Sequence, residues 1–178
     1  MEIDWDYTNS EVHLSMRSYI QDALTRFCHA HPRKLQDQPY THAKPTYGAK
    51  AKYATDTDYS PLLLPSQKKF VQEVTETFLY YAQAIDASML PALRTIATQQ
   101  SAPTENTMHK VNQYLDYAAT HLDAIITYRA SNMILPAHSD ASYLSESKAR
   151  SRAGGNFHVR QLRHTAKQWI RPHYFTNH

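Results

Sequence analysis

The chain has 178 residues, of which 42% are hydrophobic and 20% charged, with a formal net charge of +3 at pH 7. This size suits one sizeable hydrophobic core or two small ones. No apolar run approaches about 18 residues and no basic-then-apolar leader follows Met1, so the sequence predicts neither a membrane span nor a secretion signal. The single cysteine, Cys28, excludes an internal disulfide framework and favours an intracellular protein, cytoplasmic or nuclear.

The positive charge is concentrated at the C-terminal end. Residues 1–144 contain 12 Lys/Arg and 15 Asp/Glu, a net of −3, whereas residues 145–178 contain 7 Lys/Arg and one Glu, a net of +6. A basic segment of this kind can contact a polyanion such as nucleic acid, or it can simply be solvated. Charge alone leaves both possibilities open.

The N-terminal residues alternate between apolar and polar on both sides of Thr8-Asn9-Ser10. A period of two predicts a β-hairpin with one buried face, formed by Ile3, Trp5, Tyr7, Val12, Leu14 and Met16. A hairpin at this place has little to pack against, so we expect that an element before it is missing. Ser18 is a candidate cap for a short helix, whose apolar side would be Ile20, Ala23, Leu24 and Phe27.

Residues 29–65 contain five prolines and no sustained hydrophobic period. Proline removes backbone donors that helices and sheets need, so this span is predicted to be an irregular, poorly packed linker. At its start, Cys28, His29 and His31 could suggest a metal site if His42 folds back. Their spacing matches no standard zinc pattern, which favours an incidental polar loop.

Helical periodicity returns after residue 65. Ser66 is a candidate cap for a helix with the apolar stripe Val71, Val74, Phe78, Ala82 and Ile85. Asp86 and Ser88 predict a break before a second helix with Pro91 in its first turn and an apolar side of Leu93, Ile96 and Ala97. Pro103-Thr104 predicts the start of a third, carrying Met108, Val111, Leu115 and Ala118. The flanking tyrosines could stack on bases, but they fit the edges of a core better: Tyr80, Tyr81, Tyr114 and Tyr117.

Short apolar runs follow His121. Residues 124–128 and 133–138 are predicted to be strands joined across 129–132, and Gly154-Gly155 precede a third strand through Phe157 and Val159. The expected fold class is therefore α+β. It comprises an N-terminal β-hairpin and helix, a long irregular linker, a small helical bundle and a partial C-terminal β-hairpin.

One carboxylate, Asp140, is predicted near the end of the strand that precedes a basic loop in "HSDASYLSESKARSRAGG". An aspartate there commonly caps a turn through its side chain. It could instead be a metal ligand for Mg²⁺, although two-metal phosphodiester hydrolysis requires several acids. The cations of the loop, Lys148, Arg150 and Arg152, are candidate phosphate contacts.

Three stretches resemble the Pol polyprotein of retrotransposons. "FLYYAQAIDASMLPALRTIATQQSAPTENTMHKVNQYLDYAATH" and "YRASNMILPAHSDASYLSESKARSRAGG" are similar to the segment where the reverse transcriptase thumb and connection pass into ribonuclease H. "IDWDYTNSEVHLSMRSYIQDALTRF" is similar to the hairpin and helix that follow the polymerase palm. The likeness runs from about residue 1 to Gly155.

The resemblance implies a role for each part of the chain. Asp140 matches the first metal-binding aspartate of ribonuclease H, on its first strand, and Gly154-Gly155 match the start of the second strand. The implied divisions are a palm-following hairpin and helix at 1–28, a linker at 29–65, a thumb and connection at 66–121, an incomplete ribonuclease H-like start at 122–159 and an unrelated basic tail at 160–178. The parent protein would be an RNA-directed DNA polymerase and ribonuclease H that uses Mg²⁺.

The departures from this family predict a fragment that is inactive alone and binds no Mg²⁺. Only 23 residues follow Gly155 and none is acidic, no two acids are adjacent anywhere, and Pro136 falls inside the predicted leading strand. We expect weak, non-specific contact with RNA–DNA or duplex nucleic acid and none with membranes, and the oligomeric state stays open. Two alternatives are a free-standing helical protein-interaction module, and a nuclease combining Asp140 with Glu73, Glu76 or Asp116.

Overall fold

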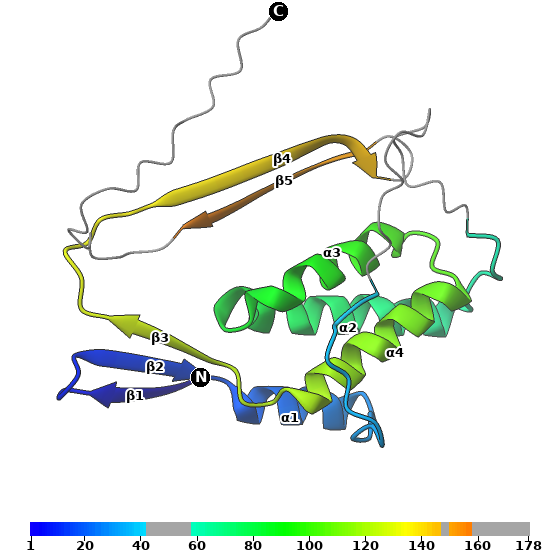
Figure 1. Ribbon diagram of the computed structural model, residues 1–178. Helices are drawn as coiled ribbons and strands as arrows, with labels where there is room; N and C mark the ends of the chain where they lie inside the picture. The colour runs from blue at the N-terminus through cyan, green and yellow to red at the C-terminus, as the bar shows by residue number, and fades with distance from the viewer. Residues whose placement is uncertain (42–57, 147–149, 158–178) are drawn as a thin grey trace, which may run out of the picture.

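The computed structural model describes residues 1–41, 58–146 and 150–157, and Figure 1 shows how their elements are arranged. The expected α+β class is confirmed, with four α-helices and two small antiparallel sheets within these residues. The helices are α1 (Arg17–Arg26), α2 (Pro65–Ala84), α3 (Leu90–Gln99) and α4 (Glu105–Thr120), with a short 3-10 turn, η1 (Ala87–Met89), before α3. The strands are β1 (Glu2–Asp6), β2 (Glu11–Ser15), β3 (Ile125–Arg129), β4 (Ala137–Glu146) and β5 (Arg150–Phe157).

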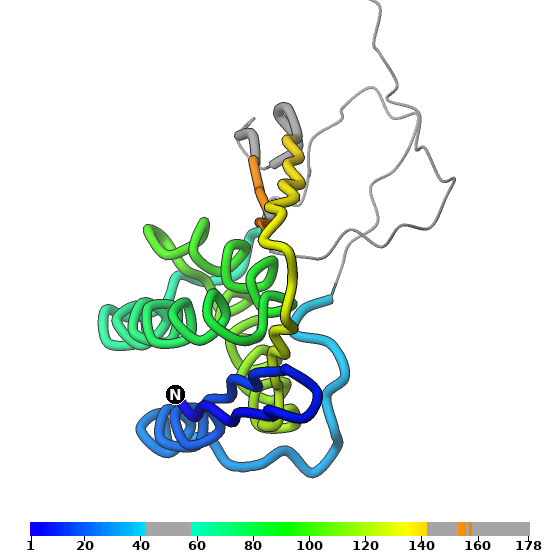
Figure 2. The backbone as a smooth tube through the Cα atoms, turned by 90° about the vertical axis from the view of Figure 1, so that its left-hand side faces the viewer, coloured from blue at the N-terminus to red at the C-terminus, as the bar shows by residue number. Residues whose placement is uncertain are grey.

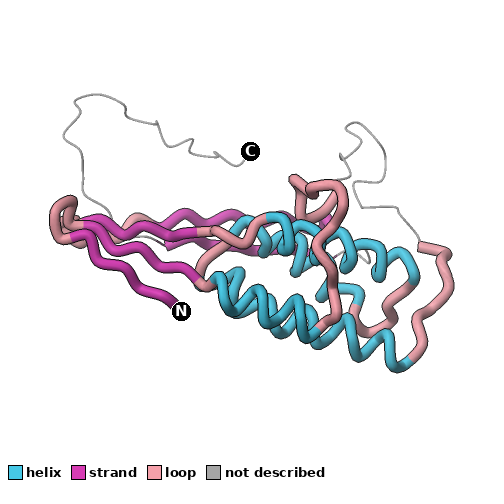
Figure 3. Tube along the Cα trace, turned by 90° about the horizontal axis from the view of Figure 1, so that it is seen from below, coloured by secondary structure: helices cyan, strands magenta, loops and turns pink. Residues whose placement is uncertain are grey.

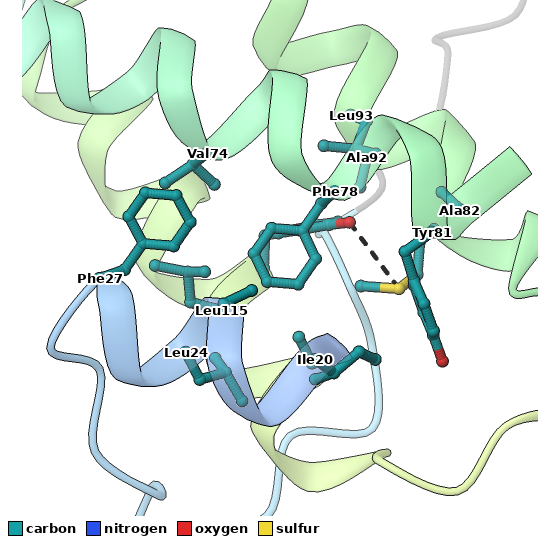
Figure 4. Packing of buried hydrophobic residues seen from close by; sticks show 14 of the residues in the cluster. Ile20, Leu24, Phe27, Val74, Phe78, Tyr81, Ala82, Ala92, Leu93 and Leu115 are labelled. Atoms are coloured by element: carbon teal, nitrogen blue, oxygen red, sulfur yellow. Dashed lines mark hydrogen bonds between the residues drawn. The ribbon is translucent and has the colours of Figure 1, made fainter. Parts of the chain in front are cut away.

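The hydrophobic core lies among the four helices. The expected stripes of α2 and α4 are confirmed, because Val71, Val74, Phe78, Ala82, Ile85, Val111, Leu115 and Ala118 are all buried. The ring of Phe78 lies edge-on to that of Tyr114, with centroids 5.4 Å apart, and stacks on Phe27 of the turn after α1, at 6.3 Å. Figure 4 shows Ile20 and Leu24 of α1 reaching toward the same cluster. Among the helical residues predicted to face the core, only Ala97 is exposed, Met108 is half-buried, and Ala92 is buried in place of Ala97.

Two of the four predicted capping residues make the expected hydrogen bonds and two do not. Asp86 accepts a hydrogen bond from the Ser88 N–H at η1, and Thr104 accepts one from the Thr107 N–H at α4, as expected. The predicted caps at Ser18 and Ser66 are wrong. The Ser18 hydroxyl donates to Glu2 Oε1 at 2.9 Å instead. Helix α2 begins at Pro65, where the Gln67 side chain accepts from the Leu64 N–H at 3.0 Å.

The N-terminal hairpin is confirmed, but its predicted buried face is confirmed only near Met16 and Leu14. Strands β1 and β2 pair antiparallel around a turn at 7–10, and β3 joins β2 as a third strand, with Leu14 opposite Ile126. Ile3 and Trp5 remain 55% and 58% exposed. Figure 3 shows the strands projecting to the side of the helices, so the core reaches only the end of the sheet near Leu14.

Of the strands predicted at 124–128 and 133–138, the first is confirmed as β3 and the second is wrong over most of its length. β3 pairs with β2, because its alternating residues extend the hairpin in register. The next strand begins at Ala137, after Pro136, so the proline does not interrupt a strand. Met133, which precedes it, has a positive φ of 59°, incompatible with a continuous strand through residues 133–138.

The described parts of the predicted linker, residues 29–41 and 58–64, contain no helix and only an isolated bridge between Leu62 and Thr104. None of these residues is buried, so the expected loose packing is confirmed for the described part, although polar contacts tie the segment to α4. His29 Nε2 lies 2.8 Å from Asp116 Oδ1, and the Gln36 N–H donates to Thr120 Oγ1 at 3.2 Å, both on α4. Figure 1 shows residues 29–41 passing along α4. Side-chain partners on α4 thus replace the missing regular structure.

We predict that Phe78→Ala lowers the free energy of unfolding by about 3–5 kcal/mol, because it leaves a cavity where two aromatic contacts existed. Urea unfolding measures the change. Leu79→Ala on the same helix is the control, since Leu79 is 39% exposed and should cost far less. Equal losses from both substitutions would contradict the assignment of Phe78 to the centre of the core.

The start of α4 should depend on pH through Asp58. Hydrogen bonds from the Ser60 and Thr104 hydroxyls lower the pKa of Asp58 from 3.8 to about 2. A lowered pKa stabilises the folded state above pH 3.8, and this contribution is lost as the pH falls toward 2. Asp58→Asn should therefore destabilise the protein modestly at pH 6, and the difference should close by about pH 2 in urea unfolding. A difference independent of pH would show that the charge is not involved.

Candidate nucleic-acid interface at the β4–β5 hairpin

Strands β4 and β5 form a separate antiparallel hairpin that extends away from the three-stranded sheet (Figure 2). Its register places Ser139 opposite Gly155, Asp140 opposite Gly154 and Ala141 opposite Ala153. The pairing shifts between Ser142 and Glu146. The two glycines thus lie inside β5, rather than at its start, and β4 carries Asp140 in its interior, rather than at its end.

Asp140 is exposed on β4, and its Oδ1 accepts a hydrogen bond from the N–H of the next residue, Ala141, at 2.8 Å. Among the described residues, no group of three or more His, Cys, Asp or Glu side chains could hold a metal ion. Asp140 is therefore not part of a cluster of three or more such side chains among the described residues. A single exposed carboxylate is a poor Mg²⁺ ligand, because this ion releases its waters reluctantly.

An arginine that the sequence analysis did not identify joins this hairpin to the bundle. Arg94 of α3 donates from Nη1 to the Ala153 carbonyl at 3.2 Å. A Cβ added at Gly154 would lie 3.5 Å from the same nitrogen, an ordinary contact. At Gly155 a Cβ would lie 3.2 Å from the Phe157 ring, which is a tight contact. Any residue other than glycine at this position would therefore require the ring to shift. No sequence pattern connects residues 59 positions apart, so the contact could not be predicted.

The predicted basic loop is only partly a loop. Arg150 and Arg152 belong to β5, where their backbones pair opposite Glu146 and Ser142. Lys148 lies outside the described residues, as does the tail at 160–178. Two of the three predicted cations are therefore strand residues. Arg152 is two residues before Gly154, which lies opposite Asp140.

The other candidate ligands lie apart, and some of them bond to other side chains. Glu73 lies 3.7 Å from Lys69, Asp116 is bonded to His29, and Glu76 is exposed on α2. His31 Nδ1 donates to the Pro32 carbonyl at 3.0 Å, while Cys28 is an exposed free thiol. His42 lies outside the described residues. Neither the nuclease set around Asp140 nor a Cys–His metal site is assembled among the residues that can be seen.

The four tyrosines divide between core and surface. Tyr81 and Tyr114 are fully buried, and burial raises the pKa of both hydroxyls. Tyr117 lies half-buried, with its ring centroid 4.5 Å from that of His121. Tyr80 is 54% exposed and meets Tyr19 edge-on. Tyr81 and Tyr114 are therefore inaccessible to nucleic-acid bases.

No protein-family model, curated protein or solved structure matches the chain significantly. Within the residues that the structure describes, no helix is long and apolar enough to cross a membrane.

We predict that Asp140→Asn leaves the free energy of unfolding unchanged within about 0.5 kcal/mol, the usual range for a surface substitution. The new amide oxygen can still accept from the Ala141 N–H, and no other contact of this side chain is lost. Urea unfolding measures the stability, and calorimetric titration with MgCl₂ should show no saturable binding to either protein. Tight Mg²⁺ binding that disappears with the substitution would contradict a solitary carboxylate.

Proposed function

We propose that the chain is a remnant of a retroelement reverse transcriptase and ribonuclease H polyprotein, which holds nucleic acid without a complete active site. The observation that supports this best is the β4–β5 hairpin. It follows a helical bundle and pairs the strand that bears the exposed Asp140 with a strand that bears paired glycines and arginines. In the family that the sequence resembles, the thumb and connection likewise precede the first hairpin of ribonuclease H. The parent protein would be an RNA-directed DNA polymerase and ribonuclease H that uses Mg²⁺.

In this proposal the chain contributes binding rather than chemistry. Lysine and arginine side chains neutralise backbone phosphates without reading bases, so affinity falls steeply with salt. An RNA–DNA hybrid or another duplex would bind weakly and without sequence preference. Two-metal hydrolysis needs acids from several elements, and Asp140 supplies one. An intracellular place of action, cytoplasmic or nuclear, fits both the partner and the exposed thiol of Cys28.

The alternative of a helical protein-interaction module has less support. A helical module of this kind would bind through exposed apolar stripes, and the apolar stripes of these helices are buried within the bundle. Isolated exposed residues such as Leu79 and Tyr80 remain on α2, but scattered surface hydrophobics are ordinary. The helices therefore act as a scaffold that carries the strands.

The proposal predicts salt-sensitive binding that depends on residues 145–178. Fluorescence anisotropy with a labelled RNA–DNA hybrid, measured between 50 and 200 mM salt, should give a negative slope of log affinity against log salt. Each phosphate contact contributes roughly 0.7–0.9 to that slope. The triple substitution Lys148→Gln, Arg150→Gln and Arg152→Gln should flatten the slope by roughly 1–3. Deleting residues 145–178 should remove most of the binding.

A matched control removes three cations from the helices instead: Lys68→Gln, Lys69→Gln and Lys110→Gln. This variant should keep the salt slope of the unchanged protein. Binding that persists after the deletion would show that the basic segment is not its source. Mg²⁺-dependent cleavage of the hybrid that is abolished by Asp140→Asn would replace the holding role with an active nuclease.

A further inference from the structure

The three-stranded sheet leaves an apolar face uncovered. Residues directly opposite each other in neighbouring strands share a face, which gives two rows across the sheet: Ile3–Leu14–Ile126 and Trp5–Val12–Tyr128. Ile3, Trp5 and Tyr128 are each more than half exposed. Trp5 also stacks on Tyr7, with ring centroids 6.2 Å apart. Large aromatic and branched side chains are thus grouped on one surface rather than scattered.

The opposite face of β1 carries a row of acids: Glu2, Asp4 and Asp6. Glu11 of β2 is paired with Arg129 at 2.7 Å, whereas none of the three acids of β1 has a Lys or Arg partner among the described residues. Asp4 makes neither a hydrogen bond nor an ion pair there. Beside this row is an open hollow of about 440 Å³, lined by Glu2, Ile3, Asp4, His13, Ser15 and Ile125.

Strand β1 is also an edge. It pairs only with β2 among the described residues, so its outer backbone N–H and C=O groups have no strand beside them. An exposed edge can accept an added strand through main-chain hydrogen bonds, while alternating side chains determine which sequence fits.

From these three features, we propose that β1 binds an extended segment of a partner protein in which cationic and apolar residues alternate. Its backbone adds a fourth strand to the sheet. Its apolar side chains lie beside Ile3 and Trp5, and its lysines or arginines lie beside Glu2, Asp4 and Asp6. One of these cations lies beside Asp4 on the side of β1 where the hollow opens.

Charge distinguishes this occupant from two others. A second copy adding through β1 would bring the acidic rows of two identical strands together, and like charges opposite each other destabilise a sheet. Nucleic acid would meet the same acids with its phosphates. The surface is therefore separate from the basic hairpin and does not depend on the nucleic-acid proposal.

The experiment uses the full chain with Trp169→Phe, which leaves Trp5 as the only tryptophan. A capped peptide of alternating lysine and valine, about seven residues long, is titrated while Trp5 fluorescence is recorded. Saturable binding is expected. Asp4→Lys should weaken it by about fivefold or more, because attraction becomes repulsion. Glu76→Lys, an exposed charge reversal on α2, should leave it unchanged.

A second peptide, N-methylated at alternate residues on its hydrogen-bonding edge, tests the backbone pairing on the unaltered strand. It should not bind, and this comparison decides the proposal even if Asp4→Lys fails to fold by circular dichroism. Failure of the unmodified peptide to bind at about 1 mM would overturn the proposal. Equal binding of both peptides, or a concentration-dependent dimer in analytical ultracentrifugation that excludes the peptide, would also overturn it.

Discussion

The packing of α1 onto the other three helices is the contact on which the rest of the structure depends. Ile20, Leu24 and Phe27 enter a cluster centred on Phe78. A lone ten-residue helix is marginal in water, so α1 owes its stability to this apolar face. Strand β2 leads directly into α1, so the same contact also fixes where the N-terminal hairpin lies. Strand β3, which follows α4, then meets β2 in register.

The helices were predictable because their apolar residues recur at helical spacing and every stripe needs a partner. The residues that cap the helices were less predictable. Ser66 has a suitable hydroxyl, but α2 already begins at Pro65, and the Gln67 side chain makes the capping hydrogen bond. The sequence also overestimated burial of the hairpin. Alternation says that Ile3 and Trp5 share a face, but not whether anything covers that face.

The C-terminal strands were the hardest to predict, for a physical reason. Residues 137–146 lack a clear apolar alternation, so β4 has no signal of its own and depends on pairing with β5. The sequence analysis placed Asp140 near the end of one strand and Gly154-Gly155 before the next, whereas both lie inside their strands, with Asp140 opposite Gly154. Arg94, which holds Ala153, and His29, which holds Asp116, both act across long sequence separations. Contacts of that kind are invisible in local patterns.

The packing of α1 also means that the parts of the chain on the two sides of residues 42–57 share one hydrophobic core. On one side of residues 42–57 lie β1, β2, α1 and the segment bonded to α4; on the other lie α2, α3, α4 and β3. These two sets meet through a buried core and through the β2–β3 ladder. The two pieces of one chain therefore interlock through their side chains and strands as well as through the backbone that joins them.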